Sequence, residues 1–280
     1  MPTTCTFLRP LINEGIGNVE QKVIEVLDNF LQNLSPDSIR VATQEIDKLN
    51  PARHLQEGCK VPDNDLEEFL WQTWDAFISV ARQVPHDHPF QDRMVDLVEA
   101  LTLLPPLNVE IWQTNTRLWT DLPLLGPSMR EAWISPEPTE GHPTNQMAQE
   151  WINLNAFAAR LLKVDAVSWT VFGIWELREA LEEPSEISRL ECNVPAAAEW
   201  IRLSGELLYR QAIHGTEGKE EIPSVATGSL YNGKNTMCLE RWKFWKCRFG
   251  DIGEEADKHI RQVALKARRE MEVIEQDYTG

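Results

Sequence analysis

The chain has 280 residues and a mass of 32.1 kDa, with 27 Lys and Arg against 44 Asp and Glu, which gives a formal net charge of −17. An acidic chain of this kind is not a general nucleic-acid binder, because phosphate binding relies on clustered cations. Its content of 42% hydrophobic and 25% charged residues is typical of a globular protein and excludes a disordered or collagen-like chain.

The five cysteines indicate a reducing compartment. They are odd in number, widely spaced and form no C-x-x-C pair, which argues against a disulfide framework and a zinc ribbon. Residues 1–9 show no secretory signal, and the most apolar run, residues 167–175, is shorter than the roughly 20 residues of a membrane helix. We expect a cytoplasmic protein with no membrane partner.

Apolar residues recur at helical spacing along almost the whole chain. Leu66, Phe69, Leu70, Trp74 and Phe77, for example, fall on one face of a helix. In chain order, the spacing predicts helices over residues 18–34, 37–49, 64–84, 90–104, 108–120, 127–134, 145–163, 166–182, 194–213, 237–249 and 254–276.

No stretch alternates polar and apolar residues between turn signals, and the one Asn-Gly pair lies in a polar loop. We therefore predict an all-α protein, a single domain of about ten helices over residues 1–280 with a Trp-rich core or pocket. Asn193-Val194-Pro195 is typical of a helix start with Pro in the first turn. The expected irregular segments are an N-terminal arm at 1–17 and long loops at 135–144 and 214–236.

Tryptophan is in surplus, with 11 residues against 3 tyrosines. Such a surplus builds either thick packing between helices or an aromatic cavity, and the sequence leaves both interpretations open. Residues 166–181 are apolar around most of the circumference in their first half, so we expect a central helix. Glu176 and Arg178 then lie either at its solvent edge or at a buried end where they need partners.

Several short motifs lack the context that their chemistry needs. Residues 228–234 fit the phosphate-loop pattern G-x-x-x-x-G-K, but Asn235 stands where Ser or Thr should hold magnesium, and no strand precedes the loop. His86-Asp87-His88 lies between two prolines and is more typical of a helix-entry turn than of a metal site. Asp63-Asn64-Asp65 fits a helix N-terminus better than a magnesium-diphosphate site. We expect no metal and no cofactor.

Two segments carry stronger functional signals than these motifs. Trp151–Leu161 places Asn155 inside an apolar helix face, where a buried amide must bond to a neighbouring helix or to a ligand. Arg241–Phe249 places three aromatic residues on one face, with arginines beside it. Such a face can hold a flat anionic or carbonyl-bearing ligand, or it can form core packing with paired arginines.

These segments also carry a resemblance, together with Leu125–Trp133 (L-G-P-S-M-R-E-A-W) and Ala197–Tyr209 (A-A-E-W-I-R-L-S-G-E-L-L-Y). In this order, the chain resembles a fungal helical family catalogued as a domain of unknown function, whose members often lie beside secondary-metabolite genes. It is also similar to the cofactor-free hetero-Diels–Alderases of tropolonic sesquiterpene pathways. The resemblance implies a pericyclase that couples a tropolone quinone methide to a humulene-type macrocycle and forms a dihydropyran ring.

Such an enzyme needs an apolar pocket that aligns both reactants and a few donors that stabilise the charge developing on the diene oxygen. The catalytic candidates are Arg241, Trp245, Asn155 and, as general acid for the loss of water, Glu176. The substrate-binding candidates are Trp151, Ala158, Trp242, Phe249, Tyr231 and Trp119. The expected partners are tropolone and terpenoid substrates, and a homo-oligomer is left open.

Two other functions stay open at the level of sequence. A non-catalytic helical interaction protein would use the Trp-rich segments as core and the acidic surface for a basic partner. An unorthodox magnesium-dependent terpene cyclase would use Asp63 and Asp65.

Overall fold

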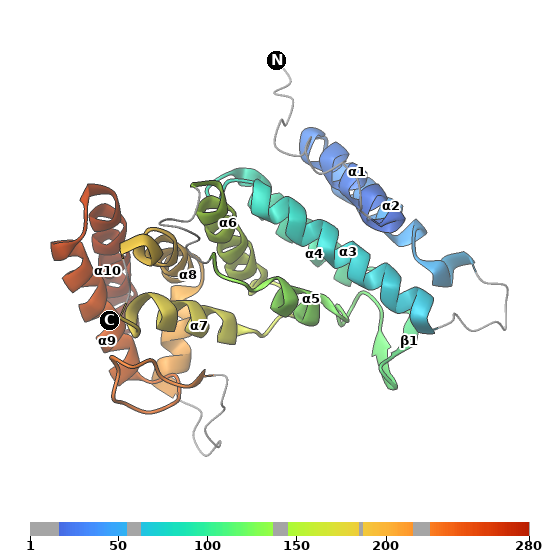
Figure 1. Ribbon diagram of the computed structural model, residues 1–280. Helices are drawn as coiled ribbons and strands as arrows, with labels where there is room; N and C mark the ends of the chain where they lie inside the picture. Colours follow the sequence, from blue (N-terminus) through green and yellow to red (C-terminus); the bar gives the residue numbers. More distant parts are fainter. Residues whose placement is uncertain (1–16, 55–62, 137–144, 185–186, 215–224, 280) are drawn as a thin grey trace. The chain divides into compact units, whose positions relative to one another are not determined.

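The computed structural model describes residues 17–54, 63–136, 145–184, 187–214 and 225–279 (Figure 1). These residues form ten α-helices, a 3-10 helix and one small two-stranded sheet, so the all-α prediction is confirmed. The chain divides into two compact units, residues 1–134 with 163–167, and residues 135–162 with 168–280. The single domain stays a prediction. Residues 1–16, 137–144 and 215–224 of the expected arm and loops lie outside the described residues.

The first unit is built around α3. This helix packs against α1, α4 and α5, and its buried face includes Phe69, Trp74 and Phe77, as their spacing predicts. The Trp74 indole N–H donates to the carbonyl oxygen of Pro123 at 2.8 Å. The elements of this unit are α1 (Asn18–Gln32), α2 (Ser38–Lys48), η2 (Pro51–His54), α3 (Asp63–Gln83), α4 (Pro89–Thr102), β1 (Asn108–Ile111), β2 (Thr114–Arg117) and α5 (Leu125–Ala132).

The helix predicted over residues 108–120 is wrong, because β1 and β2 form an antiparallel hairpin there with Ile111 opposite Thr114. Its two-residue turn consists of Trp112 and Gln113, whose φ angles of 50° and 61° are left-handed. Turns of this kind usually carry Asn or Gly, so the hairpin signal is missing from the sequence. The apolar residues of the segment also recur seven and eight positions apart, which imitates a helix.

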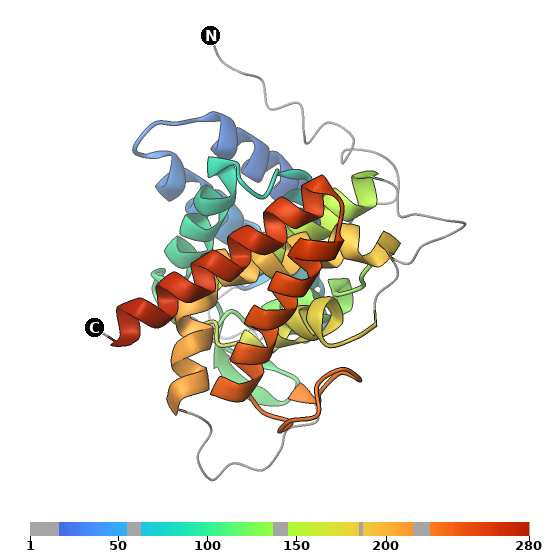
Figure 2. The same cartoon turned by 90° about the vertical axis from the view of Figure 1, so that its left-hand side faces the viewer.

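The second unit is built around α8, which packs against α6, α7, α9 and α10. Figure 2 shows α8, α9 and α10 side by side, in orange and red. A β-carbon at Gly173 of α7 would lie 2.7 Å from the ring of Trp200 on α8, so the close approach of these two helices depends on glycine. The helices are α6 (Asn145–Leu161), α7 (Thr170–Leu181), α8 (Ile187–His214), α9 (Leu239–Glu255) and α10 (Lys258–Thr279).

Helix α8 begins at Ile187 and runs through Pro195, so the predicted helix start at residues 193–195 is wrong. Proline inside a helix removes one backbone hydrogen bond and crowds the preceding turn. Cys192 and Val194, in the turn before Pro195, are fully buried. Their packing into the core supports helix where the local sequence favours a boundary.

Candidate functional site

A buried carboxylate, Glu182, joins two of the predicted catalytic residues. Glu182 directly follows α7, Arg241 and Trp245 lie one turn apart on α9, and all three side chains are fully buried. Arg241 Nε donates to Glu182 Oε1 at 2.6 Å, and Nη2 donates to Oε2 at 3.1 Å. The Trp245 indole N–H donates to Oε1 at 2.6 Å. The structure therefore brings Arg241 and Trp245 together, but around a residue that the sequence analysis missed.

The remaining bonds of Arg241 hold the loop that precedes α9. Nη1 donates to Val225 O at 2.6 Å, and Nη2 donates to Ala226 O at 3.0 Å. Gly228 N donates to the same Glu182 carboxylate at 2.8 Å. With four of its hydrogen bonds made inside the protein, the guanidinium has little donor capacity left for a ligand. Arg241 is thus part of a buried ion pair that fastens the loop to the end of α7.

The first amides of the G-x-x-x-x-G-K loop are also engaged within the chain. Gly228 N binds Glu182, and Ser229 donates to Glu183 Oε2 from N at 3.2 Å and from Oγ at 2.8 Å. These donors are therefore already bonded to the carboxylates of Glu182 and Glu183.

Tyr231, a predicted substrate-binding residue, lies beside Arg241. The guanidinium carbon is 5.8 Å from the centre of the Tyr231 ring and 5.5 Å from that of Trp245. The Tyr231 hydroxyl lies 3.6 Å from Cys238 Sγ, and its ring centre lies 5.1 Å from that of Phe244. Burial raises the pKa of Tyr231 above its ordinary value, and the bond to Cys238 is the second largest cause of this increase. The phenol consequently stays protonated at neutral pH.

Glu176 is a second buried carboxyl group, in the middle of α7. It is 1% exposed, and the indole N–H of Trp151 on α6 donates to its Oε1 at 3.3 Å. Burial raises the pKa of Glu176 well above its ordinary value, although the Trp151 bond acts in the opposite direction. Burial also raises the pKa of the Cys192 thiol to about 12, with a further contribution from Glu176. Glu176 thus has the protonation of a general acid but lines neither of the pockets described below.

Asn155 bonds to a neighbouring helix, one of the two arrangements that the sequence left open. Its Nδ2 donates to Trp151 O at 3.0 Å, and the indole N–H of Trp200 on α8 donates to its Oδ1 at 2.8 Å. Ala158, one turn further along α6, is fully buried, and its carbonyl oxygen accepts from the Trp169 indole at 3.3 Å. Both residues tie α6 to its surroundings.

The other aromatic candidates are core residues. Trp242 and Phe249 are fully buried in a hydrophobic cluster of the second unit. Trp119 belongs to the first unit, where its indole N–H donates to Asp47 Oδ1 at 2.7 Å and its ring packs edge-on against Trp74. The structure therefore places nine of the ten predicted site residues in the second unit and Trp119 in the first.

A family model described as "Protein of unknown function (DUF3632)" matches residues 74–249, well over half of the chain. The chain belongs to this family. The resemblance found in the sequence is thereby confirmed as far as a family of unknown function, and the DUF3632 match includes all ten predicted site residues and Glu182. No curated protein and no solved structure matches the chain.

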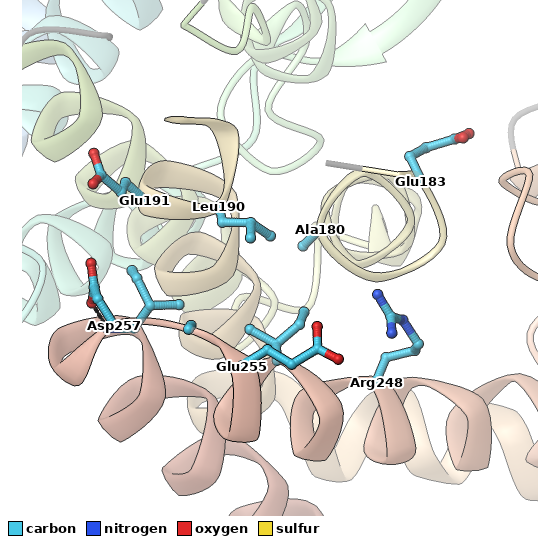
Figure 3. A pocket seen from close by; sticks show the side chains of 10 residues that line it. Ala180, Glu183, Leu190, Glu191, Arg248, Glu255 and Asp257 are labelled. Carbon is cyan, nitrogen blue, oxygen red and sulfur yellow. Dashed lines mark hydrogen bonds between the residues drawn. The ribbon is translucent and has the colours of Figure 1, made fainter. Parts of the chain in front are cut away.

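This DUF3632 protein has a pocket of about 440 Å³ where α7, α8, α9 and α10 meet, within the second unit (Figure 3). Ligand pockets in proteins typically measure roughly 300–1,000 Å³. None of the ten predicted site residues lines it, and we name it the α7–α10 pocket. Its apolar lining is Ala180, Leu190, Ile252, Ala256 and Ile260, and its charged lining is Glu183, Glu191, Arg248, Glu255 and Asp257.

Arg248 is the guanidinium of this pocket. Its Nε donates to Leu181 O at 3.3 Å, and its Nη1 donates to Asp251 Oδ2 at 3.2 Å. Figure 3 shows its side chain extending from α9 toward α7. The sequence left open whether the arginines beside the aromatic face of Arg241–Phe249 bind a ligand or are paired within the core. Arg241 is paired within the core, and Arg248 is the arginine of that segment that lines this pocket.

A second, more open pocket of about 400 Å³ lies along α8, α9 and α10 and includes Trp242. The Trp242 indole N–H donates to Glu275 Oε1 at 2.9 Å, and the ring lies 5.1 Å from that of Tyr209. Since Trp242 is fully buried and already bonded, this pocket offers a ligand little of its ring.

Within the described ranges, no helix is both long and apolar enough to cross a bilayer. In the same ranges, no three His, Cys, Asp or Glu side chains gather as ligands for one metal ion. Asp65 is exposed at the start of α3, and the side chain of Asp63 lies outside the described residues.

Proposed function

We propose that the protein binds a small, largely apolar organic substrate in the α7–α10 pocket and acts on it as a cofactor-independent enzyme. The observation that supports this is the pocket itself, whose lining combines five aliphatic side chains with charged ones that include one guanidinium. Burial of aliphatic surface supplies affinity at about 25 cal/mol per Å², and one well-placed polar group fixes the orientation of the ligand.

Arg248 takes the donor role that the sequence analysis gave to Arg241. Its bonds to Leu181 and Asp251 use Nε and Nη1, so among the described residues its Nη2 keeps N–H donors for a ligand oxygen. The side chain is 29% exposed, and a bound apolar ligand would exclude water from it. A donor aimed at an oxygen that gains charge in the transition state contributes about 3–4 kcal/mol to catalysis.

The narrower proposal is a hetero-Diels–Alderase of fungal secondary metabolism, located in the cytoplasm. The substrates would be a tropolone quinone methide and a humulene-type sesquiterpenoid, as the resemblance implies. One carbon–carbon and one carbon–oxygen bond form together, no group leaves, and no electrons are exchanged with a cofactor. The pocket would hold the reactants aligned, which replaces a bimolecular encounter, and Arg248 would bind the diene oxygen.

The test is product formation by the full chain from a tropolone quinone-methide precursor and a humulene-type alcohol in the presence of a chelator, followed by mass spectrometry. We expect faster and stereoselective adduct formation that Arg248→Met lowers by about 100-fold. The matched control is Arg40→Met, since Arg40 is an exposed arginine on α2 of the first unit. An unchanged rate in Arg248→Met would refute the assigned donor, and no acceleration by the unaltered protein would refute the chemistry.

A non-catalytic interaction protein is the second candidate. The observation that favours it is that Arg241, Trp245 and Asn155 have partners within the fold, as core residues do. This candidate predicts no rate acceleration and no ligand in the α7–α10 pocket, so the same experiment separates the two functions.

A further inference from the structure

We propose that Asn232 is a site of spontaneous deamidation, and that the isoaspartate formed there displaces Gly233 from its contact with Tyr231. The modification requires only water, so it does not depend on the function proposed above. The Asn232-Gly233 pair lies in the second half of the G-x-x-x-x-G-K segment, in the loop that precedes α9.

The reacting groups lie at the exposed tip of this loop. Asn232, Gly233 and the following Lys234 are all exposed. Among the described residues, none forms a hydrogen bond with the Asn232 side chain or with the Gly233 backbone N–H. The base of the loop is fixed, because Thr227 N donates to Asn235 Oδ1 at 3.1 Å. The two groups that must react are therefore in contact with water and are not engaged elsewhere in the fold.

The reaction closes a ring between neighbouring residues. The Gly233 backbone nitrogen attacks the side-chain carbonyl carbon of Asn232, its proton passes to water, and ammonia leaves as the succinimide ring closes. Water then opens the ring at either carbonyl group and gives aspartate or isoaspartate. One water is consumed, one ammonia is released, and no oxidant or reductant takes part. Glycine favours the attack because it has no β-carbon to crowd the nitrogen.

Packing explains why a glycine stands at position 233. A β-carbon there would lie 2.1 Å from the Tyr231 hydroxyl oxygen and 2.2 Å from Cζ of the same ring. The ring cannot easily give way, because Tyr231 is buried and its ring centre lies 5.1 Å from that of Phe244. Any side chain at position 233 would therefore displace Tyr231, and the fold retains the residue that makes Asn232 labile.

Isoaspartate should disturb this contact. It lengthens the backbone between residues 232 and 233 by one methylene group, whereas Asn235 still holds the far side of the loop through Thr227. Gly233 then cannot keep its place against the Tyr231 ring. The Tyr231 hydroxyl lies 3.6 Å from Sγ of Cys238, a partly buried thiol at the start of α9. Movement of the ring should therefore expose Cys238.

The first measurement is peptide mapping of the full chain by mass spectrometry after incubation at pH 8 and 37 °C. We expect the peptide with Asn232 to gain the mass difference between an amide and an acid, and to become a substrate of a protein isoaspartate methyltransferase. Asn33 is the internal control, because it is also exposed but is followed by Leu34, and its peptide should react far more slowly.

The second measurement is alkylation of Cys238 by iodoacetamide, followed on its own peptide. Protein that has accumulated isoaspartate should be alkylated several-fold faster than fresh protein. Freshly prepared Asn232→Asp carries the new charge on an unaltered backbone and should behave like fresh protein. Asn232→Gln forms the corresponding ring much more slowly and should stay unchanged after the same incubation. Cys247, an exposed thiol on α9, should react at one rate in all samples.

Three results would overturn the proposal. If Asn232 persists as long as Asn33, it is not a deamidation site. If isoaspartate forms but the alkylation of Cys238 does not change, Tyr231 is not displaced. Faster alkylation in fresh Asn232→Asp would assign the effect to charge rather than to the length of the backbone. None of these results bears on the α7–α10 pocket, so the proposed enzyme is tested separately by its own assay.

Discussion

The buried pair of Glu182 and Arg241 predicts a specific pattern of stability changes. Glu182→Met leaves the Arg241 guanidinium without a counter-charge, although the carbonyl oxygens of Val225 and Ala226 still accept from it. Arg241→Met leaves a buried carboxylate that keeps the donors of Trp245 and Gly228. The double variant removes both charges together.

The magnitudes follow from these contacts. Removing one member of a buried ion pair costs about 3–5 kcal/mol, so each single variant should lose that much. The double variant loses the pair and strands two buried donors, the Trp245 indole and Gly228 N–H, at about 1–2 kcal/mol each. It also removes the donor of the Val225 and Ala226 carbonyl oxygens, but these two residues are only partly buried, so water can replace the guanidinium there. Its total cost is therefore about 2–4 kcal/mol, well below the sum of the single losses.

The assay is urea unfolding followed by circular dichroism at pH 7, with Arg40→Met as an exposed control expected to change stability by less than about 0.5 kcal/mol. The free energies of the two single variants and the double variant form a thermodynamic cycle. Additive losses would refute the pair as the main interaction of Arg241. An Arg241→Met protein of full stability but without activity would instead restore Arg241 as a catalytic residue.

Three further predictions concern α7 and its neighbours. Because the pKa of Glu176 is raised in the folded protein, the folded chain keeps a proton that the unfolded chain releases above the ordinary glutamate pKa of 4.5. The free energy of unfolding should therefore fall by about 1.4 kcal/mol per pH unit from pH 4.5 up to the folded pKa. Glu176→Gln should remove this slope in unfolding experiments between pH 4.5 and 8. Asn155→Ala strands the buried indole N–H of Trp200 and should cost about 1–3 kcal/mol, measured by urea unfolding; no loss would mean that water replaces the amide. Gly173→Ala should cost about 1–3 kcal/mol because its β-carbon meets the Trp200 ring, whereas Gly205→Ala meets only a terminal methyl group and should cost less; equal melting temperatures for the two would contradict this packing argument.

Most of the helices were predictable because their apolar faces are long and regular. The helix predicted over 64–84 is α3 at 63–83, and the one predicted over 145–163 is α6 at 145–161. The hairpin was not predictable, because Trp112 and Gln113 adopt left-handed conformations without the residues that usually signal them. The start of α8 was missed because tertiary packing overrides the boundary that Pro195 suggests.

The site was predictable only where its residues are close in sequence. Arg241 and Trp245 are one helical turn apart, so the sequence could pair them. Glu182 lies 59 positions before Arg241, and only the folded chain joins them. One signal was available: a buried arginine requires an acid, and Glu182 follows the most apolar helix. The aliphatic lining of the α7–α10 pocket gave no such signal in the sequence, because Ile252 and Leu190 look like ordinary core residues.

Each of the two units is made of two separate segments of the chain, and this limits how the protein can be divided into fragments. Residues 163–167 return to the first unit between two segments of the second, and Val164 is buried there. A single cleavage near residue 134 would therefore remove residues 163–167 from the first unit and leave them on the fragment that holds the second unit. A fragment restricted to residues 74–249 would begin inside α3 and end inside α9. It would lack α1, which covers α3, and α10, which covers α8 and α9. Such a fragment would expose the buried faces of α3, α8 and α9 and should aggregate.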